Sequence, residues 1–260
     1  MKFACTFRTH SHAIHVERKR VIQMANCQQI MSPIESNLQH VNSQIIAAIA
    51  ALPSASQRPV ALVAVTKTKS VDEIRSAFAE GQREFGENYV QDAVSKIDSL
   101  RDLKAEGIVW HFIGPLQSNK SKLIATNFDW VHGVDRLKVA SALSRHRSGC
   151  GALNVCVQVN VSGEQSKSGV TPGDVMTLAR QVRQLPDIRL RGLMTIIENT
   201  VDETAQRAQF SMMRTLFEKM KSDNMDVDTL SMGMSQDFSI AISEGATMVR
   251  VGSAIFGARQ

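Results

Sequence analysis

Short apolar runs alternate with amphipathic stretches along the chain from residue 34 onward. Residues 34–52 have helical periodicity and end before Pro53. Eight apolar runs, rich in β-branched residues, then predict strands buried on both faces: 60–66, 83–86, 109–113, 130–134, 154–161, 189–195, 229–232 and 248–252. Helices are predicted between them at 70–81, 87–105, 118–126, 136–147, 172–185, 202–222 and 235–244. Strands that alternate with helices predict a parallel sheet.

The number of strand–helix units decides which parallel architecture the chain adopts. Eight units in roughly 200 residues, with no proline- or glycine-rich linker between them, favour a closed (β/α)₈ TIM barrel over an open doubly wound sheet. We therefore predict an α/β fold with a single barrel domain over residues 31–260. The run at 83–86 is short and weakly apolar, so the count of eight depends most on it.

Composition and charge narrow the class of protein. The chain has 260 residues, 43% of them hydrophobic, and no stretch approaches the roughly 18 apolar residues of a membrane helix, which excludes a membrane protein. The formal net charge is +5, but residues 1–30 hold five basic residues and one acidic residue, so the rest carries only +1. A nearly neutral body without an aromatic platform speaks against nucleic-acid binding.

The basic segment 1–30 is set apart from the predicted barrel. It holds three of the seven histidines and two of the four cysteines, without a convincing period. Its charge fits a targeting peptide, and a start codon assigned upstream of Met24 or Met31 fits its composition equally well. We expect a disordered or non-native tail that is not part of the fold.

The remaining cysteines and two histidines give no sign of a metal site. Cys150 follows a loop-like Ser-Gly pair, Cys156 lies within the predicted strand 154–161, and His111 and His132 are each isolated in the sequence. This spacing matches no zinc template, so we predict no metal. Buried or incidental thiols are typical of a reducing compartment, and we expect a cytoplasmic protein.

One lysine ends the first predicted strand, whose sequence from residue 60 is VALVAVTKTK. Side chains alternate along a strand, so Lys67 shares a face with Val63 and Val65 and lies at the rim of an apolar interior. Desolvation there favours the neutral amine, which is the form that attacks carbonyl groups. The alternative is that Lys67 only marks the exit of the strand into solvent.

The last two predicted strands end in a second cluster of polar and small residues. In this fold, the loops after the seventh and eighth strands commonly bind phosphate through backbone N–H groups. Gly233 and Gly252 permit a close approach of the backbone, and hydroxyl groups are offered by Ser231, Ser235 and Ser253. The alternative is that these glycines only turn the chain.

Arg250 lies between Val249 and Val251, so its guanidinium is predicted to face the barrel interior while the valines pack outward. A buried arginine needs an acceptor, and an internal carboxylate is the alternative to a role in binding. An amine, an arginine and a phosphate cradle around one barrel mouth suggest pyridoxal 5′-phosphate (PLP), whose aldehyde forms a Schiff base with lysine.

Seven motifs give the chain a specific family resemblance. They occur in order between residues 34 and 259: AVTKTK (64–69), FGENYVQ (85–91), WHFIGPLQSNK (110–120), EQSKSG (164–169), RGLMTI (191–196), LSMGMSQD (230–237) and VRVGSAIFG (249–257). With these motifs the chain resembles the pyridoxal phosphate homeostasis family of the YggS/PROSC type. Ser253 is the one departure at a motif position, because many members have threonine there, and the hydroxyl is kept.

The resemblance implies a barrel like the N-terminal domain of alanine racemase, with PLP held as a Schiff base on Lys67. It also implies that Asn88 and Met194 line the cofactor ring and that Arg250 faces the pyridine nitrogen. The residues implied to hold the phosphate are Ser231, Gly252 and Ser253, with the backbone of Met232 and Gly233.

The same resemblance implies a carrier of PLP in vitamin B6 and amino-acid homeostasis rather than an enzyme with robust catalysis. An arginine beside the ring nitrogen disfavours the pyridinium, which weakens the ring as an electron sink. We also expect no second domain after the last strand of the kind that completes the site in alanine racemase.

Two alternatives stay open. One is a stand-alone racemase-like enzyme, and the other is a barrel that binds another phosphorylated metabolite, with Lys67 structural. For the carrier, the expected partners are PLP and the apo forms of PLP-dependent enzymes. We expect no nucleic acid, no membrane and a monomer.

Overall fold

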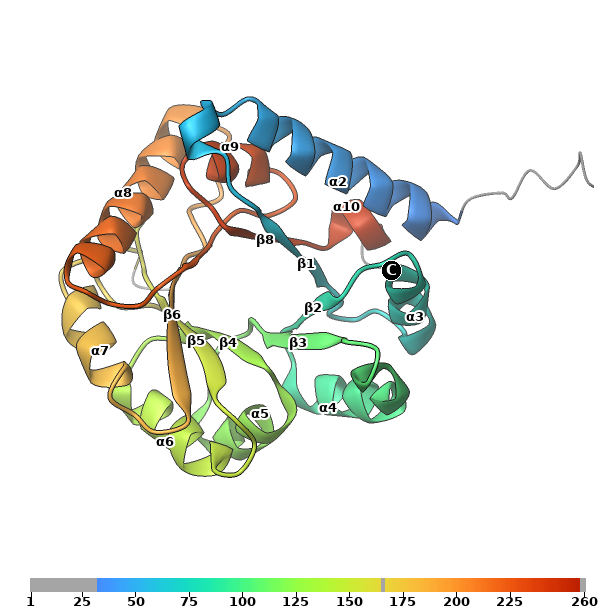
Figure 1. Ribbon diagram of the computed structural model, residues 1–260, viewed down its shortest axis with the longest axis horizontal. Helices are drawn as coiled ribbons and strands as arrows, with labels where there is room; N and C mark the ends of the chain where they lie inside the picture. The colour runs from blue at the N-terminus through green and yellow to red at the C-terminus, as the bar shows by residue number, and fades with distance from the viewer. Residues whose placement is uncertain (1–31, 165–166, 258–260) are drawn as a thin grey trace, which may run out of the picture. The chain divides into compact units, whose positions relative to one another are not determined.

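The computed structural model describes residues 32–164 and 167–257, and its centre is a closed barrel of eight parallel strands (Figure 1). The strands follow one another around the barrel in sequence order: β1 (Ala61–Val65), β2 (Glu84–Glu87), β3 (Val109–Phe112), β4 (Trp130–Val134), β5 (Leu153–Gln158), β6 (Ile188–Met194), β7 (Thr229–Ser231) and β8 (Met248–Val251). β8 pairs with β1 with Met248 opposite Ala61, which closes the ring. The predicted (β/α)₈ barrel is confirmed. The expected tail, residues 1–30, lies outside the described residues.

Helices connect the strands and form the outer layer of the barrel (Figure 1). They are α2 (Pro33–Ala50), α3 (Val71–Ala79), α4 (Val90–Ser99), α5 (Ser121–Asn127), α6 (Leu137–Arg147), α7 (Val175–Val182), α8 (Glu203–Ser222), α9 (Phe238–Ser243) and α10 (Ser253–Phe256). Within residues 32–164 and 167–257, short 3₁₀ turns accompany them: η1 (Ser54–Ser56), η2 (Arg101–Lys104) and η3 (Ser118–Lys120). In the part of the chain that the structure describes, no helix has the length and apolar character to cross a bilayer.

Two of the differences from the predicted element bounds have a clear local cause. β5 is shorter than predicted and ends at Gln158, because the Asn160 amide donates to the Val170 carbonyl (2.9 Å) and the chain pairs with its own return. The predicted helix 87–105 is divided between α4 and η2, because the backbone of Leu100 leaves the helical region with φ −115° and ψ 22°. The segments after β5 and before β3 are therefore less regular than the apolar pattern indicates.

The strands place alternate side chains in two separate layers. In β3, Trp110 and Phe112 face the helices and belong to the main hydrophobic core, while Val109 and His111 face the barrel axis. A second, smaller apolar cluster fills the inside of the barrel: Val63, Trp130, Cys156, Met194 and Met248. The interior of the barrel is thus a packed layer of its own, and polar side chains that enter it are enclosed.

Helix α2 packs against α9 and α10 beside the seam between β8 and β1 (Figure 1). Its inward face is apolar and buried: Leu38, Val41 and Ile45. The side chain of Asn37 donates to the Ile255 carbonyl in α10 (2.9 Å). These contacts hold the short helix that starts at Ser253, a residue of the predicted phosphate cradle.

Candidate functional site

A cavity of about 530 Å³ opens at the carboxyl ends of the strands, where the functional residues of this fold lie. The loops after β1, β5, β6, β7 and β8 border it. The structure brings four of the predicted residues together on its wall: Lys67, Arg250, Gly252 and Ser253. The volume falls within the range that is typical of small-molecule sites.

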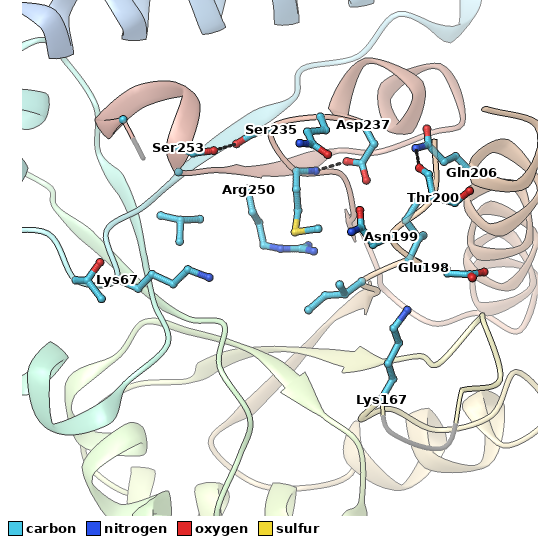
Figure 2. A pocket seen from close by; sticks show the side chains of 18 of the residues that line it. Lys67, Lys167, Glu198, Asn199, Thr200, Gln206, Ser235, Asp237, Arg250 and Ser253 are labelled. Carbon is cyan, nitrogen blue, oxygen red and sulfur yellow. Dashed lines mark hydrogen bonds between the residues drawn. The ribbon is translucent and has the colours of Figure 1, made fainter. Parts of the chain in front are cut away.

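Lys67 reaches into this cavity from the side of β1, and the Arg250 guanidinium lies across from it (Figure 2). Val63 is fully buried inside the barrel, and Val65 lines the cavity, so the predicted alternation of this strand is confirmed. Lys67 is half-buried on the cavity wall. This position differs from the alternative, in which the lysine only marks the exit of the strand into solvent.

A buried ion pair supports the loop that carries Lys67. Lys96 donates to the Thr66 carbonyl (2.9 Å) and to the Glu87 carboxylate (2.9 Å), and the Thr66 hydroxyl donates to the same carboxylate oxygen (2.8 Å). Burial raises the pKa of Glu87, although the hydrogen bonds from Lys96 and Thr66 oppose this shift. Because the ion pair joins β1, β2 and α4, it fixes the end of β1 and the start of the Lys67 loop.

Arg250 lies between the barrel interior and the cavity. The residue is 4% exposed, and its two Nη atoms donate to the Ser231 hydroxyl (2.7 Å) and the Thr195 carbonyl (2.8 Å). Among the described residues, its hydrogen bonds go to neutral oxygens, and the buried Asp237 carboxylate acts on it through its charge without a hydrogen bond to it. Burial lowers the pKa of Arg250 to about 10, and the guanidinium therefore keeps its charge at neutral pH.

Two hydroxyl groups and the start of a helix meet at the β7–β8 side of the cavity. Ser253 begins α10, and its hydroxyl donates to the hydroxyl of Ser235 in the loop after β7 (3.3 Å, Figure 2). The Asp237 carboxylate accepts the Met234 amide and so holds this loop. The first amides of a helix have no carbonyl partner within it. Hydroxyl and N–H donors gathered at one place suit an anion such as a phosphate group.

Three predicted cofactor residues lie beneath the cavity rather than on its wall. Met194 is 1% exposed and belongs to the apolar cluster inside the barrel. The Ser231 hydroxyl is fully buried and already bound by Arg250, and the Met232 amide donates to the Met248 carbonyl (3.1 Å). The role of Ser231 and the Met232 backbone in holding phosphate stays a prediction, and in this structure both groups are engaged within the barrel.

Of the three serines whose hydroxyls the sequence offers, Ser235 and Ser253 lie on the cavity wall and Ser231 does not. β7 ends at Ser231, and Gly233, with φ +94°, turns the chain toward the cavity while its carbonyl accepts the Arg250 amide (3.0 Å). The motif LSMGMSQD contains both serines, but strand alternation no longer applies after the turn. A further side of the cavity was not predicted and is formed by Lys167, residues 198–200 and Gln206 (Figure 2).

Asn88 follows β2 and lies beside the Lys67 loop. The two strands pair at Val65 and Gly86, and Lys67 and Asn88 each come two residues later in the sequence. The Oδ1 atom of Asn88 is buried and has no hydrogen-bond partner among the described residues. Gly114 allows this packing, since a Cβ there would lie 2.2 Å from the Asn88 carbonyl oxygen. A buried acceptor without a protein partner calls for an explanation, and a bound ligand or water is one.

Comparison with known proteins places the chain in a family. The family model of the alanine racemase N-terminal domain matches residues 41–260. Two proteins named pyridoxal phosphate homeostasis protein, from Pseudomonas aeruginosa and Escherichia coli K12, are 52% and 46% identical to the chain. Each match covers 88% of this chain, with 97% of the first relative and 98% of the second.

Solved structures agree with this placement. PipY of Synechococcus elongatus, solved with PLP bound, is 35% identical over 86% of this chain and 100% of its own, with a TM-score of 0.74. An alanine racemase of Corynebacterium glutamicum is 16% identical over 87% of this chain and 61% of its own, with a TM-score of 0.63, and shows the likeness of the fold alone. The chain belongs to the alanine racemase N-terminal domain family and, within it, to the pyridoxal phosphate homeostasis proteins.

Proposed function

We propose that this chain binds PLP in the cavity, holds it covalently on Lys67 and acts in PLP homeostasis. One observation carries the proposal: the Lys67 amine, the Arg250 guanidinium and the Ser235–Ser253 hydroxyl pair border one cavity of about 530 Å³. The names of the curated relatives and the PLP-bound structure of PipY support it.

The chemistry of the lining residues fits this cofactor. PLP, when bound, supplies an aldehyde that reacts with amines and a ring that withdraws electrons. Lys67 offers the amine, and the hydroxyl groups of Ser235 and Ser253 with the first amides of α10 offer donors to the phosphate. The unpaired Oδ1 of Asn88 offers an acceptor to a hydroxyl group of the ligand.

We further propose that the protein is a carrier without robust catalysis. Arg250 has donors only and a fixed positive charge, so it disfavours a proton on a ring nitrogen placed beside it. Racemisation also needs an acid or base on each face of the substrate. Tyr89, the only tyrosine of the chain, is 55% exposed and lies outside the cavity lining. The donor-only character and charge of Arg250 favour storage of the cofactor over turnover.

A carrier must also release its cofactor. We propose that a monomer of this chain delivers PLP to the apo forms of PLP-dependent enzymes. The half-buried position of Lys67 at the cavity wall supports this step, because an amine or water from outside can reach the covalent bond that the lysine makes. A fully enclosed lysine would instead retain the cofactor.

The test combines binding, delivery and turnover in the full-length protein. We expect PLP to produce a visible absorbance band with the wild type and with the exposed control variant Lys138→Ala, and no such band with Lys67→Ala. The loaded protein should reactivate an apo PLP-dependent enzyme faster than free PLP at the same concentration. A colourless mixture would contradict PLP binding, and rapid racemisation of L-amino acids that is lost in Lys67→Ala would favour the enzyme instead.

A further inference from the structure

A continuous chain of hydrogen bonds runs through the barrel interior to Arg250. Glu84 Oε2 contacts His111 Nε2, and His111 Nδ1 lies 2.9 Å from His132 Nε2. His132 Nδ1 lies 2.9 Å from Ser231 Oγ, which accepts from Arg250 (2.7 Å). The two histidines are isolated in the sequence, yet neighbouring strands place them side by side. None of the three groups between Glu84 and Arg250 reaches the cavity wall.

This chain of hydrogen bonds starts at the amino-terminal rim of the barrel and ends at the cavity. Glu84 is the first residue of β2, and its side chain is 33% exposed. His111, His132 and Ser231 are fully buried. The ring of His111 also stacks on Trp130, with centroids 5.4 Å apart and planes within 12°. Packing therefore leaves the two imidazole rings little freedom to turn away from each other.

The donor and the acceptor of each hydrogen bond follow from the two end groups, Arg250 and Glu84. Arginine only donates, so Ser231 Oγ accepts from Arg250 and has one proton left for His132 Nδ1. An ionised carboxylate only accepts, so His111 Nε2 carries a proton for Glu84. Both rings are then neutral Nε2–H tautomers, and every link has one donor and one acceptor.

The opposite order of donors is unfavourable. It would turn the lone pair of His111 Nε2 toward the Glu84 carboxylate and would leave the Ser231 proton without an acceptor in the chain. A charged His132 is also disfavoured, because burial lowers its pKa well below the usual range, and His111 and Arg250 add to the shift. The arrangement with two neutral rings is thus the one that the buried groups favour.

We propose that Glu84, His111 and His132 are positioning residues for Arg250. They orient the Ser231 hydroxyl so that its lone pair faces the guanidinium, and this fixes the arginine at the cavity. The role in cofactor binding rests on the proposed function, whereas the coupling between Glu84 and Arg250 does not.

The coupling is tested by nitrogen NMR on the ¹⁵N-labelled full chain without added ligand. We expect the wild type and Glu84→Gln, which keeps an acceptor, to show His132 as a single Nε2–H tautomer and Arg250 with distinct, slowly exchanging Nη–H signals. Glu84→Leu fills the same space without an acceptor, so His132 should lose the single tautomer and the Arg250 signals should merge. The exposed control Glu106→Leu should behave as the wild type.

Two results would overturn the coupling: wild-type His132 with its proton on Nδ1, or unchanged His132 and Arg250 signals in Glu84→Leu. If Glu84→Leu fails to fold, Ser231→Ala carries the test, since it cuts the link directly and should merge the Arg250 signals. Unchanged Arg250 signals in that folded variant would equally overturn the proposal.

Titration with PLP separates this inference from the proposed function. Glu84→Leu should bind PLP about fivefold more weakly than the wild type, the effect of about one hydrogen bond, and Glu84→Gln should restore the affinity. Equal PLP affinities of the wild type and Glu84→Leu would overturn the role of these hydrogen bonds in the site. A wild type that binds no PLP would refute the proposed function, and the NMR result would still decide the coupling.

Discussion

Removal of one hydroxyl at the phosphate end of the cavity should weaken the binding of PLP and spare the binding of pyridoxal, which has no phosphate. Ser253 and Ser235 contribute the two side-chain hydroxyls at this end, and they lie 3.3 Å apart. The perturbations are Ser253→Ala, Ser235→Ala and the double variant. Each single change deletes one hydrogen-bond donor without creating a large cavity, because Ser253 is exposed and Ser235 is half-buried.

The expected magnitude follows from the charge of the acceptor. A hydrogen bond to a charged group contributes roughly 1.5–3 kcal/mol, and the exposure of Ser253 places it at the lower end. About 1.5 kcal/mol corresponds to roughly a tenfold increase in the PLP dissociation constant. Because the Ser253 hydroxyl donates to Ser235, the two effects are coupled, and the double variant should lose less than the sum of the single losses.

The assay is a pair of titrations of each variant, one with PLP and one with pyridoxal, followed by absorbance. The ratio of the pyridoxal to the PLP dissociation constant measures the phosphate contribution alone. It should fall about tenfold in Ser253→Ala and stay constant in Ser43→Ala, an exposed serine of α2 whose hydroxyl only bonds its own helix. An unchanged ratio in both single variants would refute the assignment of the phosphate to this end of the cavity.

Three further predictions concern stability. The pKa of buried His132 lies below its value in the unfolded chain. Below about pH 6.5 the unfolded chain therefore binds one more proton than the folded protein. The free energy of unfolding should then fall by roughly 1.4 kcal/mol per pH unit, until the pH reaches the pKa of His132 in the folded protein. Urea unfolding between pH 7 and 5 tests this, and a folded His132→Gln variant with the same slope would contradict it. Lys96→Met leaves the Glu87 carboxyl buried without its cation and should cost roughly 3–5 kcal/mol in urea unfolding, whereas a loss near zero would show that the pair is dispensable. Truncation of residues 1–30 should leave the melting temperature and the PLP affinity unchanged, and a clear drop in either would show that the tail packs on the barrel.

The strands and their order were predictable from the sequence because the pattern is local. A strand buried on both faces needs a short apolar run, and eight such runs separated by helical stretches leave few parallel architectures. The same locality explains the errors. Apolar alternation continues past Gln158, but the chain there pairs with its own return at Val170, which is a contact between distant residues that no short run records.

The candidate site was predictable only where strand alternation extends to it. Lys67 and Arg250 line the cavity as strand alternation predicts, because Arg250 lies within β8, Lys67 follows β1 by two residues, and valines fix the phase of both strands. The sequence offers Ser231 and Ser235 alike, and strand alternation could not rank them, because a glycine turn separates Ser235 from β7. The partnership of His132 with Ser231 was also hidden, since only the closed barrel brings β4 opposite β7.

The identity of the lysine that holds PLP tests the central claim most directly. Full-length protein is loaded with PLP, reduced with borohydride, digested and mapped by mass spectrometry. We expect one principal modified residue, Lys67, and no stable adduct on Lys69 or Lys167, which also line the cavity. A principal adduct on either of those residues, or an equally modified Lys67→Ala variant, would contradict the account.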